Sequence, residues 1–356
     1  MIRIGDFRVT DKQREIVNQI LDSGRLTEGP WVEKLERKME EFLGVKHAIL
    51  TTNGTVSLQL ISHLYEPGLT VCVPAMTFPA TINAFLATGK NVVLCDIGED
   101  LQIDIDKLTD KQKKEIDIIV PVHLMGYTAN MKKIMEEAEK YNWTVIEDTA
   151  EAFGAKIDDK YAGTIGDFGS YSFYVSHNIG CGELGMVVTN NDYHAMLLRS
   201  IKNHGRVGDS LKFLHSYIGS NYKTTEFMAG ICYANMENVK EILDTRIQNC
   251  EYFFENTTNE NIEPFNIKQD ISPLGYAFKC NSEAYKNYVC AHLKDAGIET
   301  RDIFPCLANQ EAFKHMFKSK DYPIADELEK RIFYIGCHQY LTEEEKKLIV
   351  ETLNSL

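Results

Sequence analysis

Long apolar runs, closely spaced cysteines and an excess of basic charge are all missing from this sequence of 356 residues. No stretch approaches the roughly 18 apolar residues that can span a membrane, and residues 1–15 contain no apolar signal region. The formal net charge of −14 gives no general attraction to nucleic acid or to anionic membranes. We therefore expect a cytoplasmic protein that binds neither, and whose anionic ligands need a local site.

The nine cysteines are scattered along the chain and never form a C-x-C or C-x-x-C motif. They stand at positions 72, 95, 181, 232, 250, 280, 290, 306 and 337. This distribution indicates reduced thiols and matches neither a disulfide framework nor a zinc site. We expect no metal.

The chain is too long for one small core, so two domains of unequal size are expected, over residues 1–235 and 236–356. Apolar strands alternate with amphipathic helices, which is typical of a parallel, doubly wound α/β sheet. Expected strands cover residues 47–52, 71–74, 91–97, 117–123 and 144–148. Two further strands, 168–174 and 185–189, are expected to fold back on this sheet as a pair.

Capping residues mark the first two helices. Thr10 and Gly24 bound the first, and Pro30 and Gly44 bound the second. A single long helix over residues 225–254 is expected to lead into the second domain.

Asn53-Gly54-Thr55 lies between an expected strand and an expected helix. The first turn of a helix carries unpaired N–H donors and partial positive charge, so Gly54 and Thr55 suit a phosphate. For these residues taken alone, a helix cap without any ligand is the simpler interpretation.

Asp148 ends the apolar strand WTVIED, and ligands of parallel α/β sheets lie at the carboxyl ends of strands. Its neighbour Glu147 reads as an ordinary surface carboxylate. A phosphate loop together with such an aspartate suggests pyridoxal phosphate, whose ring nitrogen stays protonated beside a carboxylate. Phe78, just after a strand, can cover the flat ring by stacking, or it can belong to the core.

Together with the segment SFYVSH (172–177), these pieces resemble the DegT/StrS-type sugar aminotransferases, which use pyridoxal phosphate on nucleotide-linked keto-sugars. The resemblance runs nearly end to end and rests on DSGRLTEGPWVEKLE (22–36), TTNGTVSLQL (51–60), PAMTFPATINA (74–84), VHLMG (122–126), IEDTAEAFGA (146–155), GDFGSYSF (166–173) and GSNYKTTEFMAG (219–230). It implies the type I fold of pyridoxal-phosphate enzymes, similar to aspartate aminotransferase. Such a fold has a large α/β domain on a mixed sheet and a smaller C-terminal α+β domain.

The resemblance also implies roles for single residues. Gly54, Thr55 and Ser172 correspond to the residues that hold the cofactor phosphate. Phe78 corresponds to the residue that stacks on the ring, and Asp148 to the partner of its nitrogen.

Two further positions carry family roles. Glu151 stands where the family has a glutamine close to the ring. Asn221 corresponds to a residue that reaches the cofactor phosphate of the neighbouring subunit, which implies a homodimer with shared active sites.

His177 is the main departure from the aminotransferase pattern. Five residues after the phosphate-binding serine, the aminotransferases carry the lysine that binds the cofactor covalently, and an imidazole cannot form that imine. The same exchange marks the sugar 3-dehydratases, and Glu183 and IGCHQ (335–339) resemble the GDP-4-keto-6-deoxymannose 3-dehydratase branch. Leu184 and the segment NHGRVGDS (203–210) depart from that branch.

The resemblance to this branch implies a lyase. Pyridoxal phosphate, bound without a covalent link, takes an amino group from L-glutamate to give pyridoxamine phosphate. A nucleotide-linked 4-keto-6-deoxy sugar then loses its C3 hydroxyl, His177 moves the proton, and ammonia is released. The scattered cysteines do not match the branch that carries an iron–sulfur cluster.

Several alternatives stay open. The chain can be a true aminotransferase that uses Lys202 or Lys223, or a non-catalytic nucleotide-sugar binder, and His177 can mark a degenerate or engineered site. Arg301 and His338 are candidate substrate contacts, although a surface ion pair for Arg301 and a packed turn for His338 explain them equally well.

Overall fold

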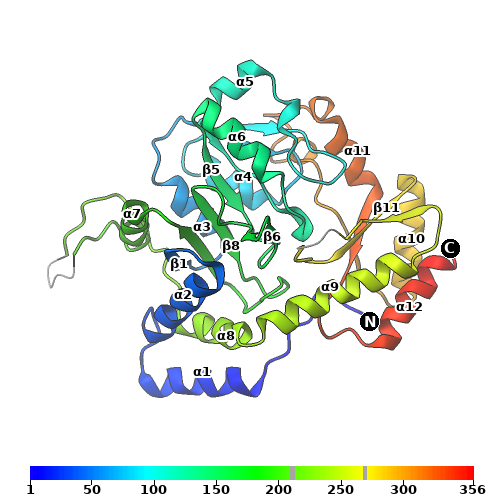
Figure 1. The fold of residues 1–356 in the computed structure, drawn as a ribbon, viewed down its shortest axis with the longest axis horizontal. Coiled ribbons are helices and arrows are strands. Elements are labelled where there is room, and N and C mark those ends of the chain that lie inside the picture. Colours follow the sequence, from blue (N-terminus) through cyan, green and yellow to red (C-terminus); the bar gives the residue numbers. More distant parts are fainter. Residues whose placement is uncertain (209–212, 268–270) are drawn as a thin grey trace.

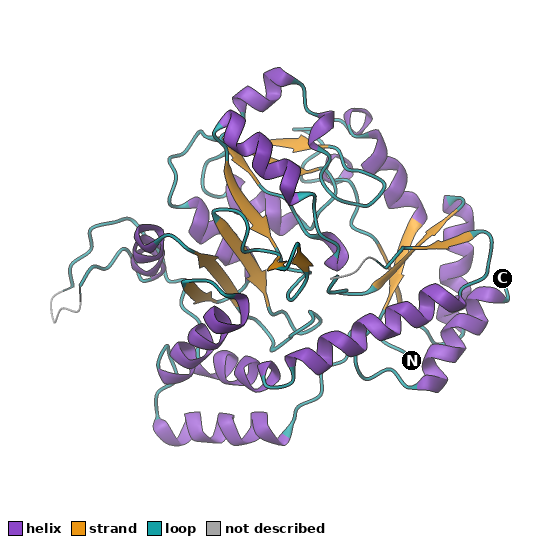
Figure 2. Ribbon diagram, in the orientation of Figure 1, coloured by secondary structure: helices purple, strands orange, loops and turns teal. Residues whose placement is uncertain are grey.

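The computed structural model describes residues 1–208, 213–267 and 271–356 (Figure 1). Within these ranges a seven-stranded sheet has the order β1-β9-β8-β5-β4-β2-β3, and a four-stranded sheet has the order β10-β11-β13-β12. Helices surround the larger sheet, and the smaller sheet lies beside it at the C-terminal end of the chain (Figure 2). We call residues 1–236 the large-sheet part and residues 239–356 the small-sheet part.

The large sheet is mixed, because β9 runs against its neighbours β1 and β8 while the other neighbouring pairs are parallel. Its strands are β1 (His47–Thr51), β2 (Thr70–Pro74), β3 (Asn91–Cys95), β4 (Ile118–Ile119), β5 (Thr144–Asp148), β8 (Phe168–Ser172) and β9 (Gly185–Thr189). All strands except β9 therefore end at the same edge of the sheet.

Apolar side chains cover both faces of this sheet, which is why helices pack on each of them. On one face lie α3 (Gly54–Ser62), α4 (Pro79–Leu86) and α7 (Asp192–Lys202), and on the other lie α2 (Pro30–Leu43) and α6 (Met131–Tyr141). The remaining elements of the large-sheet part are α1 (Asp11–Ser23), α5 (Asp110–Glu115), α8 (Glu226–Met236), the hairpin of β6 (Lys156–Ile157) and β7 (Lys160–Tyr161), and single 3-10 turns at Ile105–Lys107 and Leu124–Gly126.

The small-sheet part has a core of its own, to which the N-terminus contributes through a bridge between Ile2 and Ile298. Helix α9 crosses from the large-sheet part to this second core, and both chain ends lie near it (Figure 1). The elements of the small-sheet part are α9 (Val239–Asn256), β10 (Ile262–Pro264), β11 (Tyr276–Cys280), α10 (Glu283–Asp295), β12 (Thr300–Asp302), α11 (Pro323–Arg331), β13 (Ile332–Ile335), α12 (Glu343–Asn354) and 3-10 turns at Leu307–Asn309 and Ser319–Asp321.

The first two predicted helices are confirmed together with their boundaries. Thr10 forms a capping box with Gln13, and Gly24 ends α1 in the left-handed conformation with φ 66°. Pro30 begins α2, and Gly44 ends it in the same left-handed way.

Two predicted elements are wrong in length. The helix expected over 225–254 is two helices, because α8 ends at Met236 and α9 begins at Val239, with Asn238 outside the helical region at φ −113° and ψ 20°. The strand expected over 117–123 shrinks to β4, because Pro121 lacks the N–H that a ladder needs. Asp209 and Ser210 of the segment 203–210 lie outside the described residues.

The predicted division of the chain after residue 235 stays a prediction. In the ranges that the structure describes, no helix has both the length and the apolar character needed to cross a bilayer.

Candidate active site

Residues predicted to hold a cofactor converge on one edge of the large sheet. Asp148 ends β5, Ser172 ends β8, and Gly54 and Thr55 follow β1. Because the carboxyl ends of these strands meet at one edge, residues far apart in the sequence come together there. Phe78 lies at the same edge, between β2 and α4.

Gly54 packs directly against Ser172. A Cβ atom added to Gly54 would lie 2.8 Å from the Ser172 Cβ, so this approach of α3 to β8 requires glycine. The Asn53 side chain caps α3 by accepting from Val56 N at 3.0 Å, which leaves the first N–H groups of the helix directed outward. Helix-start donors beside the Ser172 hydroxyl fit the phosphate of a cofactor.

Asp148 is buried, and its carboxylate accepts two hydrogen bonds from other residues of the large-sheet part. Thr81 Oγ1 donates to Oδ2 at 2.8 Å, and Ala150 N donates to Oδ1 at 3.2 Å. Burial raises the pKa of the Asp148 carboxyl above its usual value, and these two donors only partly offset it. A buried carboxylate of this kind fits a cationic ring nitrogen, which would supply the missing charge.

Glu147 corrects one sequence-based interpretation, because it is fully buried and does not lie on the surface. Its carboxylate accepts from the backbone N–H groups of Gly163, Ile165 and Gly166 at 2.7–2.8 Å. His123 Nε2 also lies 3.0 Å away. Since His123 Nδ1 accepts a backbone N–H at 3.1 Å, its Nε2 carries the proton and donates to Glu147. The pair fixes the strand that ends in Asp148.

Glu151 lies one turn beyond Asp148 and is 7% exposed. One carboxylate oxygen accepts from Met125 N at 2.8 Å. Burial raises the pKa of Glu151 to about 7; the Met125 N–H lowers it, and the charge of Asp148 raises it. At neutral pH this side chain therefore exchanges a proton readily, which a glutamine cannot do.

Replacing Glu151 by Gln is expected to stabilise the cofactor-free protein above pH 7 by up to about 3 kcal/mol, since one pKa unit corresponds to about 1.4 kcal/mol. The folded pKa of about 7 exceeds the ordinary 4.5, so stability present below pH 4.5 is lost as the pH rises through 7. Urea unfolding at pH 4, 6 and 8 measures this change. The matched control is Glu226→Gln, because Glu226 is also a buried carboxylate and accepts from Trp31 N and Val32 N. A parallel loss of stability at all three pH values in E151Q would contradict the assignment.

His177 lies on the loop between β8 and β9, partly accessible and close to the end of β8. Its Nδ1 is 3.2 Å from the carbonyl oxygen of Ser172. A carbonyl only accepts, so Nδ1 carries the proton and Nε2 keeps a free lone pair. Burial lowers the pKa of His177 from 6.5 to about 4; the Ser172 carbonyl opposes this shift, and the charge of Arg246 adds to it. The imidazole is neutral at pH 7 and can accept a proton.

Phe78 is 56% exposed, which excludes the alternative that it belongs to the core. Its ring centroid lies 5.5 Å from that of Phe304, a residue that the sequence did not single out. Leu307 N donates to Ala75 O at 2.7 Å and fastens this small-sheet segment beside the end of β2. An aromatic wall for a flat ligand thus draws on both parts of the chain.

The two candidate substrate contacts, Arg301 and His338, differ in exposure. Arg301 is exposed on β12 and pairs with Glu299 at 3.2 Å, on the strand that leads to Phe304. His338 is buried, with Nε2 3.1 Å from Arg3 O and Nδ1 accepting Tyr340 N at 3.3 Å. Both ring nitrogens of His338 are therefore occupied, which favours the packed turn.

The two alternative imine lysines are engaged elsewhere. Lys202 Nζ is buried and lies 2.7 Å from the Glu28 carboxylate and 3.2 Å from Leu50 O. Lys223 Nζ donates to Asn203 Oδ1 at 2.8 Å. Both amines are thus engaged in hydrogen bonds within the protein.

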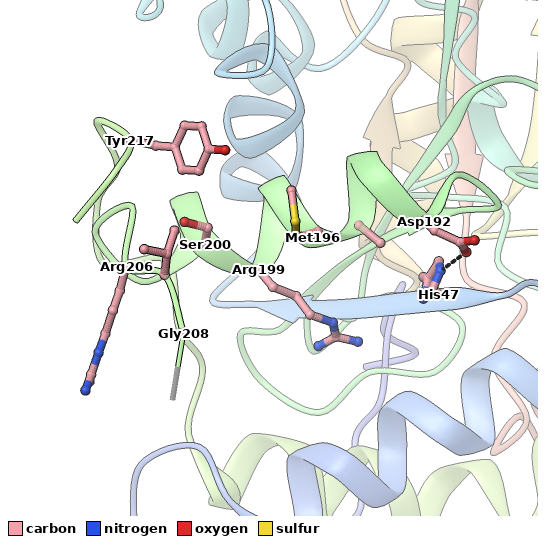
Figure 3. Close-up of a pocket in the computed structure, with 10 residues that line it drawn as sticks. His47, Asp192, Met196, Arg199, Ser200, Arg206, Gly208 and Tyr217 are labelled. Atoms are coloured by element: carbon pink, nitrogen blue, oxygen red, sulfur yellow. Dashed lines mark hydrogen bonds and ion pairs between the residues drawn. The ribbon is translucent and has the colours of Figure 1, made fainter. Parts of the chain in front are cut away.

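Asn221 is exposed, on a segment whose Tyr222 carbonyl accepts from Thr52 N at 3.2 Å. Near this segment a surface hollow of about 520 Å³ lies between α7 and residues 206–208 and 217, lined in part by Arg199, Ser200 and Tyr217 (Figure 3). Residues around Asp148 do not line this hollow. The cofactor edge and the hollow are separate features.

Metal-binding groups do not gather in the described ranges: no three histidine, cysteine or acidic side chains there could hold an ion. The expectation that the protein lacks an iron–sulfur cluster stays a prediction.

Comparison with solved structures identifies the fold. A putative sugar aminotransferase from Streptococcus pneumoniae matches with a TM-score of 0.94 at 23% identity over 99% of this chain and 97% of that chain. An E. coli GDP-4-keto-6-deoxy-D-mannose-3-dehydratase matches with a TM-score of 0.91 at 23% identity over 99% of both chains. The fold is that of the type I pyridoxal-phosphate enzymes, as the sequence predicted.

Comparison with known sequences identifies the family. The profile of the DegT/DnrJ/EryC1/StrS aminotransferase family matches residues 8–354. The GDP-perosamine synthase of Escherichia coli O157:H7 is 31% identical to this chain over 97% of its length and 96% of the relative's. The chain belongs to the DegT/DnrJ/EryC1/StrS aminotransferase family.

Proposed function

We propose that this chain removes the C3 hydroxyl from a nucleotide-linked 4-keto-6-deoxy sugar of the GDP-4-keto-6-deoxymannose kind. L-Glutamate supplies an amino group, and a 4-keto-3,6-dideoxy sugar and ammonia leave. One observation carries the proposal: His177, a neutral imidazole whose Nδ1 carries the proton, stands at the position that the sequence resemblance assigns to the family's lysine, while Lys202 and Lys223 are engaged elsewhere. The likeness to a 3-dehydratase fold is consistent with it, and the 31% identical relative also bears a GDP-sugar name.

Pyridoxal phosphate, bound without a covalent link, supplies an electron sink and, as pyridoxamine phosphate, the amino group. The helix start at Gly54 and Thr55 and the Ser172 hydroxyl hold the phosphate. Asp148 keeps the ring nitrogen protonated, and Phe78 covers one face of the ring. Glu151 lies where it can exchange a proton with the ring substituents.

His177 serves as the general base and, once protonated, as the acid for the departing C3 hydroxyl. Its Nε2 is unprotonated and available to accept a proton at neutral pH, because the Ser172 carbonyl keeps the hydrogen on Nδ1 and burial keeps the ring neutral. One group can do both tasks in turn, since the base that gains a proton becomes the acid that donates it. The reaction then needs no second titratable side chain.

The missing lysine decides the fate of the nitrogen. In an aminotransferase a lysine amine frees the aminated sugar and takes its place on the cofactor. Imidazole cannot do this, so water releases the product and the nitrogen leaves as ammonia. A lyase results from the same fold.

A homodimer with shared active sites accompanies this proposal. Residues 205–208 and 213–218 extend away from the body of the molecule (Figure 1), and Phe213 is 80% and Ile218 93% exposed. Large exposed apolar side chains beside an exposed Asn221 suit contact with a second copy of the chain. Sedimentation of the holoenzyme measures the mass of the assembly and so tests whether it is a dimer.

Borohydride reduction of the holoenzyme is expected to label no lysine, because a histidine stands at position 177 and the amines of Lys202 and Lys223 are bonded elsewhere. Peptide mapping after reduction measures this outcome. His177→Lys is the matched positive control and is expected to become labelled at position 177. Labelling of Lys202 or Lys223 in the unmodified enzyme would instead support a true aminotransferase.

Product analysis distinguishes the candidate functions. The enzyme is incubated with pyridoxal phosphate, glutamate and GDP-4-keto-6-deoxymannose, and the sugar product is examined by mass spectrometry. A product that lacks one oxygen supports the dehydratase, whereas an intact 4-amino sugar supports an aminotransferase and contradicts the proposal. A binder without activity would show no glutamate-dependent change of the cofactor spectrum.

A further inference from the structure

Asn178, the residue after His177, bonds to a segment that is distant in the sequence. Its Nδ2 donates to the carbonyl oxygen of Ser272 at 2.8 Å and to the Ser272 hydroxyl at 2.6 Å. Asn178 is 4% exposed and Ser272 is 1% exposed. Since Ser272 belongs to the small-sheet part of the chain, this contact joins the His177 loop to a segment of that part whose Ile271 and Leu274 pack in the core of the large sheet.

Ser272 is itself held by the large-sheet part. Its hydroxyl donates to Phe153 O at 2.5 Å, so the hydroxyl both accepts from Asn178 and donates. Its N–H donates to Gly126 O at 3.1 Å. A Cβ atom on Gly126 would lie 2.1 Å from Ser272 O, and Gly126 has a φ of 89°, so only glycine permits this approach.

The residues after Ser272 are fixed from a third side. Arg246 of α9, 2% exposed, donates to Pro273 O at 3.0 Å and to Leu274 O at 2.5 Å. Two charge-assisted bonds to consecutive carbonyls hold the backbone of this segment. Ser272 therefore offers Asn178 a firmly fixed partner.

The start of the loop that carries His177 is exposed, whereas residues 178–181 are buried. Tyr174 and Val175 are exposed by 44% and 37%. Local backbone bonds join His177 N to Tyr174 O at 2.8 Å, and Asn235 Nδ2 donates to Gly180 O at 2.6 Å. The two bonds from Asn178 are the side-chain link nearest to the imidazole.

We infer that Asn178 and Ser272 form a latch between the two parts of the chain, and that this latch positions His177 for proton transfer. Asn178 is a positioning residue, since it acts through the backbone it shares with His177. The inference rests on the proposed function in taking His177 as the base. Loss of the latch leaves the imidazole free to leave the Ser172 carbonyl, so its geometry and its proton affinity change together.

The test follows the reactivity of His177 in the cofactor-free protein toward diethyl pyrocarbonate, mapped by mass spectrometry against the other histidines. Asn178→Ala is expected to raise the modification rate of His177 about fivefold, the population change expected when about one net hydrogen bond is lost. The pH midpoint of that reactivity is expected to move upward, toward the ordinary value of histidine. In turnover, kcat falls while KM changes little.

Asn249→Ala is the matched control, because Asn249 is 2% exposed and donates to two small-sheet carbonyls, Cys337 O at 3.2 Å and His338 O at 3.1 Å. It is expected to lower thermal stability without changing the reactivity of His177. If Asn178→Ala likewise lowers thermal stability but leaves the reactivity of His177 unchanged, the latch is only a structural contact and the inference is overturned.

Ser272→Ala decides the matter if Asn178→Ala does not fold. It keeps the 2.8 Å bond from Asn178 to the backbone carbonyl and loses the 2.6 Å bond, together with the hydroxyl's own bond to Phe153 O. A smaller rise in His177 reactivity supports the latch, and no rise overturns it. Because reactivity is measured without cofactor or sugar, its outcome is independent of whether the sugar product contradicts the proposed function.

Discussion

Replacing His177 by Asn is expected to slow loss of the C3 hydroxyl by about 10²–10⁴-fold, the usual contribution of a positioned general acid–base group. Asparagine can still bond to the Ser172 carbonyl through its amide, as Nδ1 does at 3.2 Å, but it offers no base. The phosphate cradle at Gly54 and Ser172 does not involve the imidazole, so cofactor affinity is expected to change little.

Single-turnover measurement with the preformed pyridoxamine phosphate enzyme isolates this step. His292→Asn serves as the control, because His292 lies exposed on α10 and bonds only to Tyr288 O in the described structure. It is expected to react like the unmodified enzyme. If H177N retained turnover near the original rate, another residue would be the base.

Replacing Asp148 by Asn is expected to weaken cofactor binding by about 10- to 150-fold. A hydrogen bond to a charged group contributes roughly 1.5–3 kcal/mol, and about 1.4 kcal/mol corresponds to a tenfold change in affinity. Thr81 and Ala150 already donate to Asp148, so the remaining capacity of its carboxylate is what a ring nitrogen would use. Titration of the apoenzyme with pyridoxal phosphate measures the loss.

Stability separates this role of Asp148 from a purely structural one. Burial raises the folded pKa of Asp148, so its ionised form is unfavourable in the empty site, and the D148N apoenzyme should unfold at an equal or higher urea concentration at pH 7. The matched control is Asp96→Asn, because Asp96 is equally buried and accepts from Ile324 N and Ala325 N at the start of α11. D96N is expected to lose stability and keep its cofactor affinity. If D148N instead lost stability at pH 7 and kept its cofactor affinity, Asp148 would have a structural role.

Local signals predicted what local physics determines. The capping box at Thr10, the proline at Pro30 and the glycines that end α1 and α2 act within one helical turn, so the sequence places them correctly. The position of Asp148 followed from one rule about where parallel strands end, and the structure places it there.

Contacts between distant residues escaped the sequence. Glu147 alternates with Asp148 along β5 and reads as a solvent-facing carboxylate, yet three backbone N–H groups and His123 pair with it in the interior. The Phe78–Phe304 wall depends on how the small sheet packs against the large one, which no local pattern encodes. The same holds for Asn178 and Ser272, which are 94 positions apart.

The fate of the donor nitrogen tests the central claim most directly. The enzyme is given glutamate labelled with heavy nitrogen, together with GDP-4-keto-6-deoxymannose, and the label is followed into ammonia and into the sugar. With a histidine at position 177, we predict one labelled ammonia for each sugar that loses its C3 hydroxyl, and no label in the sugar. Label retained in a 4-amino sugar whose C3 hydroxyl is intact would contradict the account.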